Sequence, residues 1–179
     1  LFLLQQVFFV PMMTNFALWP GGPQFAPWQL LTYAFLHGGF AHLAFNMLGL
    51  MVFGNDLERL WGPKRYLQFY FASVLSAAAA QLIVTALTGG VYPTVGASGG
   101  LFGLLLAYAM LFPNRTIMPL FPPIPMKART FVIVFGALEL FLGVLDRSGI
   151  AHFAHLGGMV GGFLMIRYWR GQAPFGRRR

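Results

Sequence analysis

The sequence has little charge and no cysteine. Only 9% of its 179 residues are charged and 58% are hydrophobic, whereas a soluble domain carries about 25% charged residues. The absence of cysteine excludes a disulfide framework, a thiolate metal site and a cysteine nucleophile. The shortage of charge excludes an ordinary water-facing surface, and the mean hydropathy of +0.68 agrees. The chain is therefore predicted to be a membrane protein.

Basic side chains are missing from two long stretches. No Lys or Arg occurs between Leu1 and Glu58, or between Tyr66 and Asn114. The chain has a net charge of +8, but its basic residues are not distributed as in a protein that binds nucleic acid. No nucleic-acid partner is therefore expected. The basic residues instead form short clusters between apolar runs, as cytoplasmic loops do. Apart from Arg147, all of them fall on one predicted face of the membrane, which we take as cytoplasmic: Arg59, Lys64, Arg65, Arg115, Lys127, Arg129, Arg167, Arg170 and Arg177 to Arg179.

The apolar runs predict an all-α membrane protein. A helix needs roughly 20 apolar residues to span a bilayer, and the first run is shorter than that, so it is interpreted as the end of a helix that begins before Leu1. We expect one domain, residues 1–179, with six transmembrane helices, a multi-pass position in a bacterial inner membrane and a cytoplasmic C-terminus. No convincing strand is predicted, residues 11–28 are expected to lie in the membrane interface, and residues 120–126 are expected to form a loop. The six runs are 1–9, 30–53, 66–87, 95–113, 130–145 and 150–169.

Several polar side chains lie inside these apolar runs. Polar residues within spans usually face the bundle interior and mark function. The second, fourth and sixth runs all begin on the non-cytoplasmic side, which places their polar residues at similar depth. A nucleophile within reach of a base is the minimum arrangement for covalent acyl transfer, and Ser98 with His155 meets that description. The residues concerned are His37, His42, Asn46, Ser98, His152 and His155.

Glycines at four-residue spacing accompany Ser98 and His155. Gly99 and Gly103 follow Ser98, whereas Gly158 and Gly162 follow His155. Such faces let helix backbones approach closely, and their contact would bring Ser98 to His155. Each feature has a purely structural alternative, because small-residue faces are usually packing devices and a single buried polar residue is often only hydrogen-bonded. The coincidence of these residues at one depth favours a catalytic interpretation.

Three motifs resemble the rhomboid family of intramembrane serine proteases. They are His42-Leu-Ala-Phe-Asn46, Gly96-Ala-Ser-Gly99 and Ala154-His155-Leu-Gly-Gly158-Met-Val-Gly-Gly162, in the family's order, and the six-helix plan covers essentially the whole chain. The resemblance implies an endopeptidase that cleaves transmembrane protein substrates near the non-cytoplasmic side through an acyl-enzyme, without a cofactor. Ser98 would be the nucleophile and His155 the general base, as a dyad without a carboxylate.

The resemblance also implies roles for neighbouring residues. His42 and Asn46, with the Ser98 backbone N–H, would stabilise the oxyanion, and Phe102 would support the ring of His155. His152 competes for the role of base, but the glycine motif favours His155. His152 is expected to lie nearer the surface.

Two further polar residues are given structural interpretations. His37 is expected to hydrogen-bond to residues 11–28, and Glu139 is expected to be a packed, hydrogen-bonded acid. No metal site is expected, because no carboxylate or cysteine accompanies the histidines in the motifs.

Other functions remain open from the sequence. A catalytically silent rhomboid-like protein would use the same scaffold to bind membrane proteins, although such proteins lose the Ser or the His. A transporter or proton relay would also explain intramembrane His, Asn and Glu, but it predicts inverted repeats, and none is found. A lipid-modifying serine hydrolase is a third alternative. For the protease, we expect the substrate helix to approach beside residues 130–145.

Overall fold

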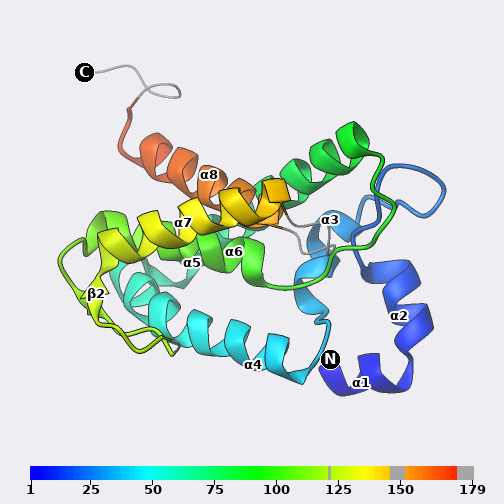
Figure 1. Ribbon diagram of the computed structural model, residues 1–179, viewed down its shortest axis with the longest axis horizontal. Helices are drawn as coiled ribbons and strands as arrows, with labels where there is room; N and C mark the ends of the chain where they lie inside the picture. The colour runs from blue at the N-terminus through cyan, green and yellow to red at the C-terminus, as the bar shows by residue number, and fades with distance from the viewer. Residues whose placement is uncertain (121, 146–151, 173–179) are drawn as a thin grey trace.

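The computed structural model describes residues 1–120, 122–145 and 152–172, and this part of the chain is mostly helical (Figure 1). One short antiparallel ladder pairs β1 with β2, in the register Thr116 to Lys127 and Ile117 to Met126. The expectation of a chain without strands is wrong at this hairpin. The elements are α1 (Phe2–Val7), α2 (Phe9–Phe16), α3 (Gln29–Thr32), η1 (Tyr33–Phe35), α4 (Phe40–Gly49), η2 (Leu50–Gly54), α5 (Asn55–Thr88), α6 (Ser98–Leu111), β1 (Thr116–Ile117), β2 (Met126–Lys127), α7 (Ala128–Leu145) and α8 (His152–Trp169).

The second apolar run is not one helix. Gly38 and Gly39 interrupt it, with Gly39 fully extended at φ 169° and ψ 172°, so that α3 and η1 are separated from α4. From Phe40 the chain stays helical through the π-helical turn η2 into α5. It bends at Gly62, whose φ of 75° favours glycine. The expected loop between the second and third runs is therefore a kink between two helical segments.

The N-terminal segment is also more helical than expected. Phe8 separates α1 from α2, and α2 includes Pro11, so the predicted interfacial segment begins as helix. Proline fits there because the first turn of a helix has no intrahelical acceptor for its N–H groups. The Gln5 side-chain amide donates a hydrogen bond of 2.8 Å to the His37 carbonyl. Its oxygen accepts one of 3.0 Å from the His37 backbone N–H. His37 thus contacts α1 through its backbone, and the predicted bond to residues 11–28 is not among its contacts.

Other helix ends follow local backbone chemistry. Helix α5 ends at Thr88 because Gly89 adopts the left-handed conformation at φ 71°, which confirms the predicted break there. Helix α6 begins at Ser98, later than the apolar run from Val95, because Gly96 has a φ of 128°. The predicted loop 146–149 and the start of the sixth run at Ile150 lie outside the described residues.

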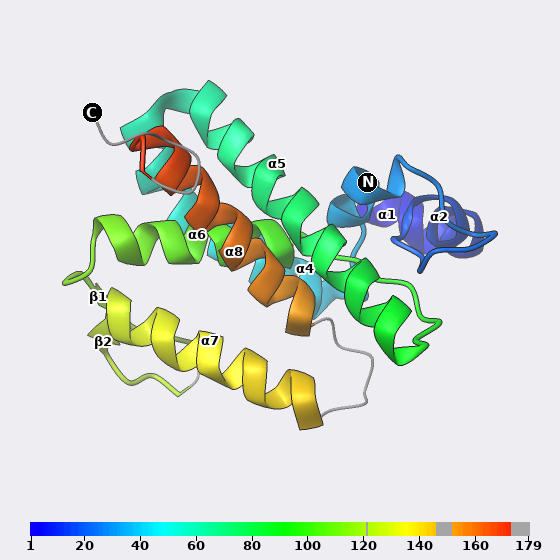
Figure 2. The ribbon, with the colours of Figure 1, turned by 90° about the horizontal axis from the view of Figure 1, so that it is seen from above.

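The centre of the molecule is formed by α5, α6 and α8, which cross one another, while α7 lies along one flank (Figure 2). Small residues allow the close crossing: a Cβ at Gly161 would lie 2.4 Å from the Cβ of Ser76. The Ser76 hydroxyl also donates a hydrogen bond of 2.7 Å from α5 to the Gly157 carbonyl of α8. Close backbone approach and interhelical hydrogen bonds are what hold helices together in lipid, where burial of apolar surface between helices contributes little.

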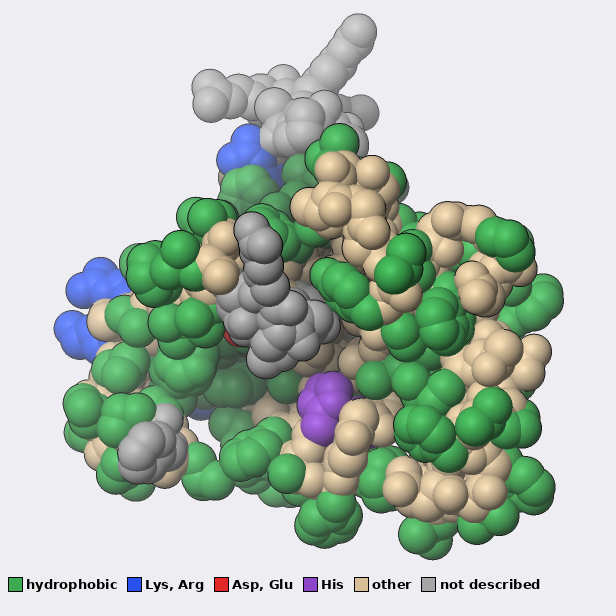
Figure 3. Space-filling view, turned by 45° about the vertical axis from the view of Figure 1, so that its right-hand side comes forward, with side chains coloured by type: hydrophobic (Ala, Val, Ile, Leu, Met, Phe, Trp, Pro, Cys, Tyr) green, Lys and Arg blue, Asp and Glu red, His purple; other side chains and the backbone are tan. Residues whose placement is uncertain are grey.

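Within the residues that the structure describes, two helical stretches are long and apolar enough to cross a membrane: Phe40–Thr88 and Ala128–Leu145. Helix α6 is apolar but has only 14 residues. Large hydrophobic side chains are exposed along α7, including Ile133 and Phe141. The face seen in Figure 3 is dominated by hydrophobic side chains, with Lys and Arg toward one side. Six separate spans stay a prediction.

Candidate active site

Ser98 stands at the first residue of α6, directly after a tight turn. Its backbone N–H is therefore one of the helix N-terminal groups without an intrahelical acceptor. The turn depends on Gly96, whose φ of 128° is rarely adopted by other residues, and a Cβ there would lie 2.8 Å from Cε1 and 2.9 Å from Nε2 of His42. The same Cβ would lie 3.5 Å from the Ser98 hydroxyl. The turn thus places Ser98 beside the ring of His42.

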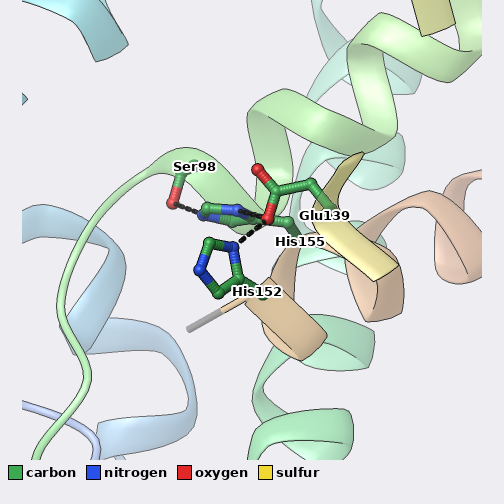
Figure 4. Close-up of polar contacts among 4 residues, drawn as sticks. All are labelled: Ser98, Glu139, His152 and His155. Carbon is green, nitrogen blue, oxygen red and sulfur yellow. Dashed lines mark hydrogen bonds and ion pairs between the residues drawn. The ribbon is translucent and has the colours of Figure 1, made fainter. Parts of the chain in front are cut away.

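The glycines of α6 and α8 bring Ser98 and His155 together. A Cβ at Gly158 would lie 1.9 Å from the carbonyl oxygen of Gly99, and one at Gly162 would lie 3.1 Å from Cα of Gly103. The two helices therefore meet backbone to backbone. Next to this contact, Nε2 of His155 lies 2.8 Å from the Ser98 hydroxyl oxygen (Figure 4).

The ring of His155 is held flat against Phe102. The two ring centroids are 4.3 Å apart and the planes differ by 4°. Phe102 lies about one turn after Ser98 on α6, so the helix that carries the hydroxyl also sets the plane of the imidazole. The stack leaves the Nε2 edge directed toward Ser98.

The opposite edge of His155 faces a carboxylate. Its Nδ1 lies 2.9 Å from Oε2 of Glu139, which comes from α7 (Figure 4). This contact has the distance of an ion pair, although it lacks the alignment of a hydrogen bond. Nδ1 of His152 lies 2.7 Å from the same oxygen. The expectation that no carboxylate approaches His155 is wrong, because the acid comes from a neighbouring helix outside the three motifs.

His152 is buried rather than near the surface, with 6% of its side chain exposed, and that prediction is also wrong. Its partner Glu139 is also largely covered, with 14% of its side chain exposed. The sequence contained a usable signal for this group. An acid in an apolar helix needs a partner, and Glu139 and His155 lie toward the facing ends of two consecutive helices.

The group formed by Glu139, His152 and His155 offers donor atoms that lie within 4.8 Å of one another, and these are types of ligand that zinc binds. Glu139 lies outside the three motifs, so the lack of a carboxylate within them does not exclude such a ligand at this site. In the structure these atoms are already at hydrogen-bond distances from each other, at 2.7 and 2.9 Å. Both histidines therefore share one carboxylate oxygen of Glu139.

His42 and Asn46 lie on α4, on the other side of the turn before Ser98. The backbone N–H of Gly38 donates to Nδ1 of His42 at 3.2 Å. The ring's hydrogen is therefore on Nε2, an atom that lies close to Gly96. Asn46 is buried, and its amide donates to the His42 carbonyl at 2.8 Å. That contact is within α4 and holds the Asn46 side chain against the turn of helix that carries His42.

The site lies far from the basic end of the bundle. His155 is near the start of α8, whereas Trp169 ends it, about 21 Å away at 1.5 Å per residue. Trp169 packs against Trp61, with centroids 5.2 Å apart, and lies beneath the guanidinium of Arg65 at 5.6 Å. Aromatic and basic residues of this kind gather at membrane interfaces. The candidate site is thus near the end of the bundle opposite to this cluster.

The chain resembles known proteins along most of its length. The Rhomboid domain family matches residues 24–171. The chain is 36% identical over 138 residues to the rhomboid protease GluP of Bacillus subtilis (strain 168), and 35% identical over 140 residues to the putative rhomboid protease YdcA of the same organism. It is 38% identical over 141 residues to the RHOMBOID-like protein 4 of Arabidopsis thaliana.

The aligned regions cover most of this chain but less of its relatives. They include 76%, 77% and 77% of the chain, and 25%, 65% and 33% of the three relatives in the same order. The matched family domain extends from before α3 to beyond the end of α8, and so includes Ser98, His155 and Glu139. The chain is an integral membrane protein and belongs to the rhomboid family.

Proposed function

We propose that residues 1–179 form a single-domain intramembrane serine endopeptidase that cleaves transmembrane proteins. The observation that carries the proposal is the 2.8 Å contact between the Ser98 hydroxyl and Nε2 of His155. It combines a nucleophile and a base within hydrogen-bond reach, at the end of an apolar bundle. Relatives that are named rhomboid proteases support the same activity.

The reaction begins with attack by Ser98. Its hydroxyl proton passes to Nε2 of His155 as the oxygen bonds to the scissile carbonyl carbon, whose π electrons move to the carbonyl oxygen. The resulting imidazolium then gives this proton to the leaving nitrogen as the C–N bond breaks, which leaves an acyl-enzyme. Water, activated by the same imidazole, hydrolyses the ester and restores Ser98. General acid–base help of this kind contributes about 10²–10⁴ in rate.

The oxyanion is stabilised from the α4 side of the site. The candidate donors are the Ser98 backbone N–H, the Nε2–H of His42 and the side-chain amide of Asn46. The Gly38 bond to Nδ1 of His42 supports this role, because it places the ring's hydrogen on Nε2. Asn46 uses one amide hydrogen toward the His42 carbonyl and has a second to offer. Such donors contribute about 10²–10³ each.

The placement of the site suggests where and how the substrate is cut. The basic clusters indicate that the Trp169 end of α8 is cytoplasmic, so that cleavage occurs near the non-cytoplasmic face. The substrate helix approaches beside α7, whose exposed apolar side chains face lipid. It must unwind locally, because a helical peptide bond is already hydrogen-bonded. The Bacillus relatives favour a bacterial plasma membrane.

The test is cleavage of a reporter transmembrane substrate by detergent-purified protein. Wild type is compared with Ser98→Ala and His155→Ala, with thermal unfolding as the control for folding. Labelling of Ser98 by a fluorophosphonate is measured in parallel. We expect cleavage and labelling by wild type and loss of both in the two variants. Cleavage by Ser98→Ala at the wild-type rate would refute the assignment of Ser98 as the nucleophile. Binding of reporter proteins without cleavage or labelling would instead favour a catalytically silent binding protein.

A further inference from the structure

Glu139 is an acidic residue within the apolar helix α7. The whole sequence holds only four Asp and Glu residues, and the neighbours of Glu139 on α7, Leu138 and Leu140, are 45% and 54% exposed. An acid in such a position is costly in a membrane and needs partners. Its partners are two imidazoles that share Oε2.

We infer that Glu139 is a positioning residue of the catalytic centre, which holds His155 for proton transfer while His152 braces the carboxylate. The inference rests on the proposed function and extends it from two residues to a group of four. It links a third helix, α7, to the Ser98 and His155 pair carried by α6 and α8.

The first consequence concerns the position of the imidazole hydrogen. A neutral imidazole carries its hydrogen on one nitrogen and accepts at the other. A carboxylate beside Nδ1 favours the form with hydrogen on Nδ1, and this leaves the Nε2 lone pair directed at the Ser98 hydroxyl at 2.8 Å. That is the form in which His155 accepts the serine proton. With the opposite arrangement, Nε2 would be a donor and Ser98 would not be activated.

The second consequence concerns charge during the reaction. His155 is neutral before attack and positive after it has taken the proton from Ser98. The carboxylate, 2.9 Å from Nδ1, stabilises this positive charge and keeps its own negative charge throughout. Because the charge develops only as the reaction proceeds, the effect lowers the barrier rather than strengthening substrate binding. Loss of the carboxylate should therefore lower kcat and leave KM nearly unchanged.

His152 explains how the carboxylate stays in place. Its Nδ1 makes the shorter contact to Oε2, at 2.7 Å, and its ring stands at 90° to that of His155. Both histidines are on α8, three residues apart, so that they face the same neighbouring helix. His152 therefore fixes the oxygen that His155 uses.

A purely structural alternative is that Glu139 only tethers α7 to α8. The two roles differ in what they change. A tether affects thermal stability and the overall amount of folded enzyme. A positioning residue affects the reactivity of Ser98 in enzyme that remains folded, and the tautomer of His155.

The experiment compares Glu139→Gln with Asp56→Asn. Both replace a carboxylate by the isosteric amide and both break an ion pair. The partner of Asp56 is Arg115, which lies between the end of α6 and β1, whereas Ser98 lies at the start of α6. We measure kcat and KM with the reporter substrate, the rate of fluorophosphonate labelling of Ser98, and thermal unfolding. For Glu139→Gln we expect kcat and labelling to fall roughly 10²-fold, with KM within about twofold of wild type. Asp56→Asn should match wild type in kcat and labelling.

The outcomes separate this inference from the proposed function. Wild-type kcat in folded Glu139→Gln, where Ser98→Ala is inactive, would overturn the inference and leave the protease intact. An inactive wild type would overturn both. If Glu139→Gln does not fold, the ¹⁵N spectrum of the wild-type histidines decides: hydrogen on Nδ1 of His155 supports the inference, and hydrogen on Nε2 overturns it.

Discussion

The closest helix crossing in the site offers a sharp test of how the geometry is set. In Gly158→Ala, the new Cβ would lie 1.9 Å from the carbonyl oxygen of Gly99, whereas real Cβ contacts are essentially never below 3.0 Å. The obstacle is backbone on the facing helix, so no side chain can rotate away. Helix α8 must therefore move away from α6 by about 1.1 Å or more, which is the difference between 3.0 and 1.9 Å.

This displacement falls on the residues that the proposed reaction needs. His155 lies one turn before Gly158 and Ser98 one residue before Gly99, so their 2.8 Å contact would open to about 3.9 Å. A misplacement of about 1 Å costs roughly 10²-fold in rate. Overpacking of this kind also costs about 1–3 kcal/mol in stability. We thus expect a rate loss of roughly 10²-fold, measured on protein that remains folded.

The assay is cleavage of the reporter substrate, together with fluorophosphonate labelling and thermal unfolding. Gly136→Ala is the matched control, because it makes the same change inside α7, where the nearest atom is the flexible Cε of Met159 at 3.4 Å. We expect it to retain activity and to gain about 0.5–1 kcal/mol of stability. Wild-type cleavage and labelling by Gly158→Ala would refute the argument that backbone contact between α6 and α8 sets the site.

Three further predictions concern other contacts. Asn46→Ala should lower kcat by about 10²–10³-fold with little change in KM, because its amide stabilises the oxyanion. An unchanged kcat would show that Asn46 only stabilises α4 through its bond to the His42 carbonyl. Phe102→Ala should lower kcat by roughly tenfold by freeing the His155 ring, whereas Phe102→Tyr should keep most activity because it keeps the stack. Ser76→Ala removes the bond to the Gly157 carbonyl and should lower the free energy of unfolding by about 0.5–1.5 kcal/mol while leaving kcat near wild type, as thermal unfolding and cleavage would show.

Much of the class of protein was decided by composition and by local sequence. The scarcity of charge requires an apolar environment for the surface, and this holds however the helices pack. Gly89 ends α5 because a left-handed residue stops a helix locally. Ser98 and His155 were candidates because polar groups in apolar runs are costly, and costly groups are usually kept for a reason.

Local sequence also misled where the backbone has freedom. The run 30–53 is apolar throughout, but Gly38 and Gly39 interrupt the helix, and hydropathy does not register a change of backbone direction. Pro11 suggested a connecting segment, yet it lies within the first turn of α2, where it is tolerated.

Only the tertiary structure decided which groups meet. Glu139 is isolated in the sequence, and its contact with His155 depends on the rotation and depth of α7 relative to α8. The same holds for the 2.8 Å contact of His155 with Ser98, which follows from glycine backbones touching across two helices. Residue types and their spacing define the face of each helix, because helical periodicity is local. The distance between two faces depends on every side chain packed between them, and therefore appears only when the whole bundle is assembled.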